Sequence, residues 1–294
     1  MDNVIGQITW TEKSETIDDL IGQGDSLLVS PMASGLEAEV LKVQTSESGY
    51  VLKTWNRSSK PDVSYQFHLL QILNRLGLPV SVPYGWGWDQ HSNKVLLTSF
   101  DGNPITKVNA KELSALARSL SSIHQTPLDT CKDSFVRKHD FVSYFYPGID
   151  NYPTLHKELL RLVDMSRMTQ DHLIHGDFNL GNIVEHEGRY TVIDWTNGQL
   201  GDPRYDFVWS SVLMKIYVSE RYGSIFLDSY RSEHPLPHEE IEIFEAIACL
   251  RLILLSRHTE LPQQTKMMDR LKNMLRNNAC LEEGILQADK EDAE

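Results

Sequence analysis

The sequence lacks several features that mark particular protein classes. Its three cysteines, Cys131, Cys249 and Cys280, form no Cys-X-X-Cys pair and are odd in number, which argues against a disulfide framework and a zinc knuckle. No apolar run approaches the ~18 residues that a membrane span requires. The first fifteen residues contain neither a basic region before an apolar stretch nor an Arg- and Ser-rich amphipathic stretch. We therefore expect no membrane span, no secretion or transit signal, and a cytoplasmic location.

Positive charge is also scarce. The chain has 28 Lys and Arg against 41 Asp and Glu, which gives a formal net charge of −13. Because such a chain repels a phosphate backbone, we expect no nucleic-acid partner. The acidic balance serves solubility and also permits a cationic small substrate. The remaining composition, 40% hydrophobic and 23% charged over 294 residues, is that of a globular protein with one large or two medium domains. Nothing in it indicates an oligomeric state.

The first hundred residues favour strands with one helix. Segments 39–45, 50–55 and 94–100 are short, rich in Val, Leu and aromatic residues, and bounded by Gly, Ser, Asn and Asp, which is typical of strands. Between 65 and 76 apolar residues recur at helical spacing, and Gly77 follows as a helix stop. We expect a sheet with one helix.

Beyond a turn-rich link at 101–104 the pattern becomes helical. Asn109 and Glu112 form a capping-box pattern before an apolar stripe that ends at His124. A histidine in this place is expected to pack in the core and not to bind a ligand. The sequence thus predicts a sheet domain at 1–100, a mainly helical domain at 101–287 and a charged tail at 288–294. Further helices are predicted at 155–167, 207–222, 239–257 and 263–277.

Residues 175–184, HGDFNLGNIV, gather one His, one Asp and two Asn around two Gly. The residues that follow predict a β-hairpin with a polar turn at 185–188. If the turn centres near residue 187 or 188, Asn182 at the start of the first strand lies roughly opposite Asp194 at the end of the second. Amide and carboxylate oxygens suit Mg²⁺, which takes one or two protein oxygens and leaves its other positions to water and phosphate. We therefore expect Asn182 and Asp194 to hold Mg²⁺.

Asp177 precedes Asn182 by five residues, on what must be a loop. A carboxylate there can orient a substrate hydroxyl group and accept its proton, so we expect Asp177 to be a general base. His175 and Gly176 are expected to shape the loop.

The spacing H-x-D-x-x-x-x-N, followed by a strand ending in Asp, resembles the catalytic loop and metal-binding segment of the protein-kinase-like superfamily. His175-Gly176-Asp177 and Ile193-Asp194-Trp195 resemble the branch of aminoglycoside phosphotransferases and choline kinases, and residues 201–206, GDPRYD, are similar to its G-D-P-x-x-D. The resemblance covers about residues 27–260. It implies an α+β, two-lobed fold with a small antiparallel-sheet N-lobe that covers the nucleotide. The larger, mainly helical C-lobe would carry the catalytic loop and the acceptor site.

The resemblance also implies roles for residues upstream of the loop. Lys53 would hold the α- and β-phosphates of the nucleotide. Ser34 and Gly35 would belong to the turn that covers the phosphates, where small residues let backbone N–H groups approach. Ser99 and Phe100 would lie in the hinge that binds the base. Asp206 would begin a helix that braces the catalytic loop from behind.

One position departs from the family pattern. The helix after Lys53 should supply a Glu that pairs with the lysine, yet the candidates are Gln66 and Gln71. A neutral amide loses the charge-assisted part of this hydrogen bond, so Lys53 would be held less firmly. Asp62 is a further candidate for compensation.

The resemblance implies a small-molecule kinase that transfers the γ-phosphoryl group of ATP or GTP, with Mg²⁺, to a hydroxyl group of a small cytoplasmic acceptor. One alternative is a nucleotide-binding regulatory or assembly protein with little turnover, which the missing Glu favours and the three retained oxygen ligands oppose. Another is a metal hydrolase that uses His175 and Asp177, although no second His or Asp cluster completes a metal site.

The sequence does not specify the acceptor. Aromatic residues at 141–152 could line an acceptor pocket, although core packing is their more common role. Acidic residues on a late helix could attract a cationic acceptor or form a solvated face. They are Glu239, Glu240, Glu242 and Glu245.

Overall fold

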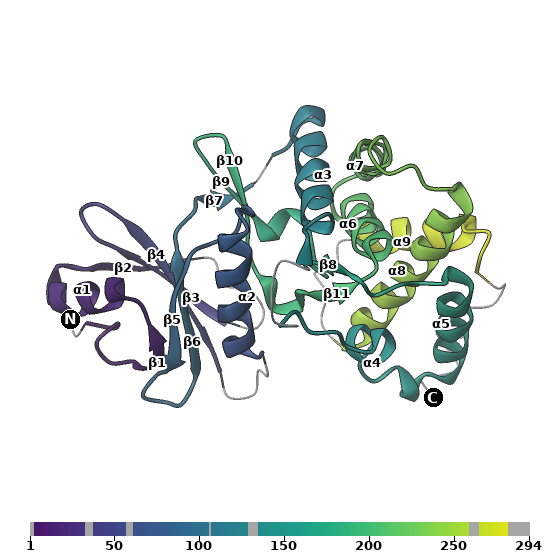
Figure 1. Ribbon diagram of the computed structural model, residues 1–294. Helices are drawn as coiled ribbons and strands as arrows, with labels where there is room; N and C mark the ends of the chain where they lie inside the picture. Colours follow the sequence, from purple (N-terminus) through teal and green to yellow (C-terminus); the bar gives the residue numbers. More distant parts are fainter. Residues whose placement is uncertain are drawn as a thin grey trace. The chain divides into compact units, whose positions relative to one another are not determined.

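The computed structural model describes residues 3–32, 38–56, 61–105, 107–128, 135–258 and 265–281. The chain divides into two compact units (Figure 1). The first comprises Met1–Ile105 and Gly181–Gly198, and the second comprises Thr106–Leu180 and Gln199–Glu294. Ser34, Gly35, Cys131 and the predicted tail at 288–294 lie outside the described residues.

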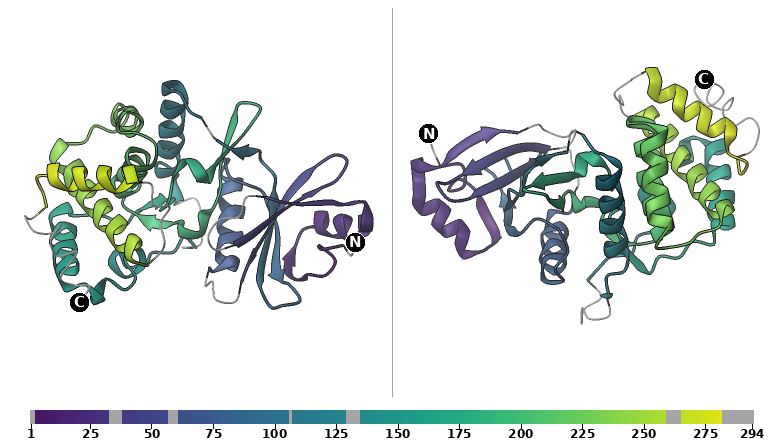
Figure 2. Two further views of the ribbon diagram at one scale, coloured as in Figure 1. Left: turned by 180° about the vertical axis from the view of Figure 1, so that it is seen from behind. Right: turned by 90° about the horizontal axis from the view of Figure 1, so that it is seen from above.

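A six-stranded antiparallel sheet dominates the first unit. Its strand order is β1-β5-β6-β4-β3-β2. Helix α2 packs on one face of this sheet against β5 and β6 (Figure 2). The strands are β1 (Thr9–Lys13), β2 (Leu28–Pro31), β3 (Ala38–Gln44), β4 (Gly49–Trp55), β5 (Pro83–Trp88) and β6 (Lys94–Ser99), and the helices are α1 (Glu15–Gln23), the 3₁₀ turn η1 (Gly24–Ser26) and α2 (Val63–Arg75).

Local sequence explains where α2 begins and ends. Asp62 caps its start, because one carboxylate oxygen accepts a hydrogen bond from Tyr65 N at 3.0 Å. Gly77, with φ +76°, adopts the left-handed conformation that is common just after a helix, and α2 ends before it. Leu69 and Leu73 are fully buried, as the helical spacing of apolar residues predicted.

The predicted hairpin is present in the first unit. Strands β9 (Ile183–His186) and β10 (Arg189–Val192) pair antiparallel, and β7 (Asn103–Pro104) adds to β9. Glu187 and Gly188 form the turn, both with positive φ. Ile193 N donates to Asn182 O at 2.9 Å, so Asn182 lies opposite Ile193 and one residue from the predicted partner Asp194. The turn centres between residues 187 and 188, as predicted, and Asn182 lies roughly opposite Asp194.

Helices form most of the second unit. Helix α6 packs against α7 and α8, and α3 packs against α7 (Figure 2). Strands β8 and β11 form a short antiparallel pair, and β8 leads directly into residues 175–180. The elements are α3 (Ala110–His124), α4 (Phe141–Phe145), η3 (Ile149–Asn151), α5 (Pro153–Ser166), β8 (His172–Ile174), β11 (Gln199–Gly201), α6 (Pro203–Tyr217), α7 (Glu220–Arg231), α8 (His238–His258) and α9 (Thr265–Asn277).

The capping box of α3 is confirmed: Asn109 and Glu112 exchange side-chain and backbone hydrogen bonds. The helix predicted at 207–222 is wrong in its bounds, because α6 begins earlier at Pro203 and ends at Tyr217. Ser219 then caps a separate helix, its Oγ accepting from Tyr222 N at 3.3 Å. Two local signals mark these bounds: a proline at the first position of α6 and a serine at the N-cap of α7. The prediction from apolar periodicity alone misses both.

No helix in the described part of the chain is long and apolar enough to cross a membrane.

Candidate functional site

The first unit contains a cavity of about 350 Å³. Six of the residues proposed from the sequence lie in its wall, although they come from four separate stretches of the chain. They are Lys53, Gln66, Ser99, Phe100, Asn182 and Asp194. Other wall residues are mostly apolar and include Val40, Val51, Leu70, Leu96, Val184 and Ile193. An apolar cavity with a few convergent polar groups is the common form of a small-molecule site.

Lys53 and Asp194 form an ion pair in this cavity. The ammonium group lies 3.5 Å from Asp194 Oδ2, and the lysine side chain is only 17% exposed. Thr196 Oγ1 donates to the other carboxylate oxygen at 2.7 Å. Asp194 has φ 64° and ψ 62°, so the β10 path ends here and the backbone turns into η5 (Trp195–Asn197).

Gln66, and not Gln71, lines the cavity. Its side chain is 3% exposed, and its Oε1 accepts no hydrogen bond within the described residues. Asp62 caps α2 instead. Tyr65 O–H donates to Gly198 O at 2.9 Å, which ties α2 to the segment that follows Asp194. The cavity therefore holds a buried acceptor on the helix from which the sequence analysis expected a Glu.

The chain after β6 presents backbone groups to the same cavity. Ser99 N donates to Val82 O at 2.9 Å and Phe100 N donates to Gly49 O at 3.0 Å, so neither amide is available to a ligand. Asp101 also lines the cavity, and its amide donates no hydrogen bond within the described residues. The hinge role of Ser99 and Phe100 stays a prediction.

The oxygen donors of Asn182 and Asp194 fit a hard cation. Asn182 ends the 3₁₀ turn η4 (Leu180–Asn182), and both side chains line the cavity. A carboxamide and a carboxylate are the ligand types that Mg²⁺ takes from proteins when phosphates and water complete its shell. No cluster of three or more His, Cys, Asp or Glu able to enclose a metal occurs among the described residues.

The second unit holds His175 and Asp177, on the loop after β8. Gly176 has φ +77°, a conformation that glycine adopts without strain. Asp206, on the first turn of α6, accepts hydrogen bonds from the backbone N–H groups of His175 and Gly176, each at 2.8 Å. Asp177 N donates to His175 Nδ1 at 3.2 Å. These contacts fix the backbone that carries Asp177.

Asp206 is fully buried and still ionised. Burial raises the pKa of its carboxyl group, but hydrogen bonds from the His124 side chain and the His175 backbone N–H outweigh burial and leave the pKa below its ordinary value. His124 Nε2 lies 3.1 Å from Asp206 Oδ2. His124 therefore packs in the core as predicted, and it also supports the residue that holds the loop.

The sequence analysis did not identify two residues that bond Asp177 or the residue before it, Trp209 and Arg251. Trp209 Nε1 donates to Asp177 Oδ1 at 3.2 Å. Arg251 Nη1 donates to Gly176 O at 3.2 Å. Arg251 stands alone in the apolar run 246–255 of α8, and a single charge in such a run is the signal that could have identified it.

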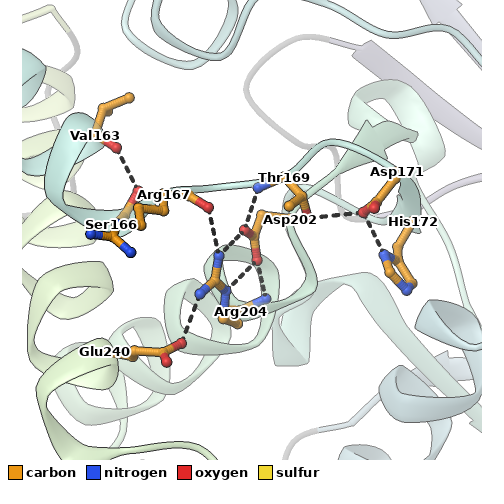
Figure 3. A network of polar contacts seen from close by, with 9 residues as sticks. All are labelled: Val163, Ser166, Arg167, Thr169, Asp171, His172, Asp202, Arg204 and Glu240. Carbon is orange, nitrogen blue, oxygen red and sulfur yellow. Dashed lines mark hydrogen bonds and ion pairs between the residues drawn. The ribbon is translucent and has the colours of Figure 1, made fainter.

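A polar network anchors the start of α6 (Figure 3). Asp202 caps the helix through Arg204 N at 2.8 Å and accepts from Thr169 N at 2.9 Å. The Arg204 side chain bonds Asp202 through Nε at 3.1 Å and Nη2 at 2.7 Å, and it reaches Glu240 on α8 at 2.7 Å. Hydrogen bonds to Asp202 raise the pKa of Arg204 above its ordinary value. The network joins the segment before β8 to α6 and α8.

The aromatic segment 141–152 and the acidic residues of α8, which were considered for acceptor recognition, serve packing and pairing in part. Phe141, Phe145 and Tyr146 are buried, and burial raises the pKa of Tyr146 well above its ordinary value. On α8, Glu240 pairs with Arg204, and Glu245 pairs with Lys215.

Comparison with solved structures identifies the fold. A choline kinase from Streptococcus pneumoniae superposes with a TM-score of 0.63 at 18% identity, over 91% of this chain and 97% of that one. A thermostable mutant of an aminoglycoside phosphotransferase, in complex with ADP and hygromycin B, gives 0.65 at 17% identity, over 90% and 99%. An ethanolamine kinase from Plasmodium vivax gives 0.61 at 15% identity, over 92% and 86%. These likenesses confirm the two-lobed α+β fold class.

Among curated proteins, none matches the chain in sequence. The model of the phosphotransferase enzyme family matches residues 29–240, a range that includes the cavity residues and the loop with Asp177. The chain therefore belongs to the phosphotransferase enzyme family.

Proposed function

We propose that this phosphotransferase transfers the γ-phosphoryl group of ATP or GTP, with Mg²⁺, to a hydroxyl group of a small molecule. The observation that carries the proposal is the convergence of Lys53, Asn182 and Asp194 on one largely apolar cavity. Proteins of the same fold support it: the aminoglycoside phosphotransferase complex contains ADP and hygromycin B, and an amicoumacin kinase complex contains AMP-PNP and Ca²⁺.

The nucleotide would occupy the cavity of the first unit. The apolar wall formed by Val40, Val51 and Leu96 suits a flat base, and the Asp101 amide, which donates no hydrogen bond within the described residues, would donate to a ring nitrogen. Lys53 would donate to phosphate oxygens, and Asn182 and Asp194 would hold Mg²⁺, which neutralises charge on the transferred group when bound. Ser34 and Gly35 stay predictions as phosphate-covering residues.

Asp177 would act as the general base. Its carboxylate would orient the acceptor hydroxyl and take its proton as the hydroxyl oxygen bonds to the γ-phosphorus. The bond from the γ-phosphorus to the bridging oxygen breaks, and the nucleoside diphosphate leaves. Trp209 and His175 would keep Asp177 in position, because Trp209 bonds a carboxylate oxygen and His175 Nδ1 accepts from the backbone.

The alternative is a nucleotide-binding regulatory or assembly protein with little turnover. The presence of Gln66 favours it, since Lys53 has Asp194 as its ionic partner and shares the cavity wall with a neutral amide in place of the expected Glu. Three points stay predictions from the sequence: a cytoplasmic location, no nucleic-acid partner and no membrane partner. The identity of the acceptor stays open.

The test is consumption of ATP and of GTP, with and without Mg²⁺, across aminoglycosides, macrolides, choline, ethanolamine, hydroxy-amino acids and sugars. We expect at least one acceptor to stimulate Mg²⁺-dependent consumption and to gain a phosphoryl group detectable by mass. Tight nucleotide binding without turnover on any acceptor would instead support the regulatory alternative. Absence of nucleotide binding would contradict both.

A further inference from the structure

Arg251 is a buried cation in the apolar middle of α8. Its side chain is 8% exposed, and its neighbours in the helix, Leu250 and Leu252, are also buried. Burying an arginine side chain is costly unless other groups compensate its charge and its donors. Among the described residues it forms no salt bridge, so hydrogen bonds and aromatic rings must compensate its burial.

The compensating contacts all belong to groups around the catalytic loop. Nη1 donates to Gly176 O at 3.2 Å and to the Tyr205 hydroxyl at 2.8 Å. The guanidinium carbon lies 4.6 Å from the ring centroid of Phe145 and 4.3 Å from that of Trp209, within the range of cation–π attraction. Burial acts to lower the pKa of Arg251, and the nearby Tyr205 and Asp177 outweigh it and raise that pKa, so the side chain stays cationic.

Each of the two peptide groups that Gly176 joins is held by a hydrogen bond. Asp206 accepts from the Gly176 N–H, whereas Arg251 donates to the Gly176 carbonyl. Because glycine has no Cβ to restrict its backbone, the Gly176 carbonyl can rotate about the Cα–C bond unless a donor retains it. That carbonyl belongs to the peptide bond that leads into Asp177.

The Asp177 side chain is held by a second contact that depends on the same arginine. Trp209 Nε1 donates to Asp177 Oδ1, and the ring of Trp209 is the one against which Arg251 packs. One side chain thus supports both the backbone before Asp177 and the indole that bonds its carboxylate.

We infer that Arg251 is a positioning residue for Asp177, which it holds through the Gly176 carbonyl and through the Trp209 ring. The inference rests on the proposed function only in that it takes Asp177 to be the general base. The contacts by which Arg251 holds the loop do not depend on that role. A purely structural arginine would stabilise the helical unit without a specific effect on Asp177.

The kinetic test compares Arg251→Met and Arg251→Lys with wild type on an active acceptor. We expect Arg251→Met to lower kcat on the order of 10- to 100-fold with little change in KM, since a misplaced base impairs the reaction and not binding. Lysine can reach the carbonyl but cannot pack as a flat group between the rings, so Arg251→Lys should restore part of the loss. In an Asp177→Asn background, Arg251→Met should have little further effect on residual turnover.

Arg270→Met is the matched control. Arg270 Nη1 also donates to main-chain carbonyls of the second unit, Ile216 O at 2.8 Å and Val218 O at 3.1 Å, and within the described residues it has no hydrogen bond to residues 175–177. Its loss should leave kcat unchanged. Equal losses in the two methionine variants, or an additive loss in the Asp177→Asn background, would overturn the inference.

Hydrogen exchange of the Trp209 indole N–H provides a readout that needs no turnover. The chain has six tryptophans, and Trp209→Phe assigns the signal. We expect exchange to accelerate on the order of 10-fold in Arg251→Met and in Asp177→Ala, but not in Arg270→Met. Unchanged exchange in Arg251→Met would overturn the inference. Faster exchange in an enzyme that turns over no acceptor would retain it while contradicting the proposed function.

Discussion

At the scale of single residues, Lys53 shares the cavity wall with Asp194 and Gln66. Asp194 is its ionic partner, 3.5 Å from the ammonium group, whereas Gln66 is neutral and its buried Oε1 accepts no hydrogen bond within the described residues. If Asp194 is to hold Mg²⁺, its carboxylate must serve the metal, and Gln66 is then the acceptor left for Lys53. A hydrogen bond between neutral and charged groups is weaker than an ion pair.

Gln66→Glu tests this use of Gln66. The charge-assisted hydrogen bond should strengthen the hold on Lys53 by about 1 kcal/mol, which corresponds to a roughly fivefold rise in kcat/KM for the nucleotide. Steady-state kinetics with varied nucleotide would measure it. Gln71→Glu is the control, because Gln71 does not line the cavity. If Gln66→Glu and Gln66→Met both match wild type, the amide has no role toward Lys53.

At the scale of elements, sequence patterns predicted contacts within an element better than contacts between elements. The hairpin was predictable because strand alternation and a Glu187-Gly188 turn are local. The sequence predicts a turn centre at residue 187 or 188, and the observed strand pairing places it between the two, because strand alternation alone does not set the exact register. Trp209 and Arg251 could not be predicted as neighbours of Asp177, because α6 and α8 reach the loop only through tertiary packing.

The start of α6 makes the loop that carries Asp177 sensitive to acid through Asp206. Its folded-state pKa is lowered, so its contribution to the free energy of unfolding is fully present above the unfolded-state pKa of about 3.9 and is lost as the pH falls through the folded-state value. Thermal unfolding from pH 7 to pH 3 should therefore show Asp206→Asn less stable than wild type at pH 7, with the difference shrinking below about pH 4. A difference that stays constant over this range would contradict the role of ionised Asp206.

At the scale of the whole molecule, the groups proposed for metal binding and for proton transfer belong to different units. Asn182 and Asp194 belong to the first unit and Asp177 to the second. The nucleotide and acceptor roles assigned from the sequence to residues 1–100 and 101–287 stay predictions. The fold and the family were predictable because the motifs at 175–206 keep their order and spacing, whereas the acceptor was not, since no motif specifies it.

The measurement that tests the central claim most directly compares nucleotide binding and phosphoryl transfer in Asp177→Asn and Asp194→Ala. We expect Asp177→Asn to bind Mg²⁺-nucleotide with the wild-type Kd while transfer falls by about 10²- to 10⁴-fold, the usual contribution of a general base. Asp194→Ala should lose both transfer and the Mg²⁺ dependence of binding. Transfer that survives in Asp177→Asn, or binding that keeps its Mg²⁺ dependence in Asp194→Ala, would contradict the account.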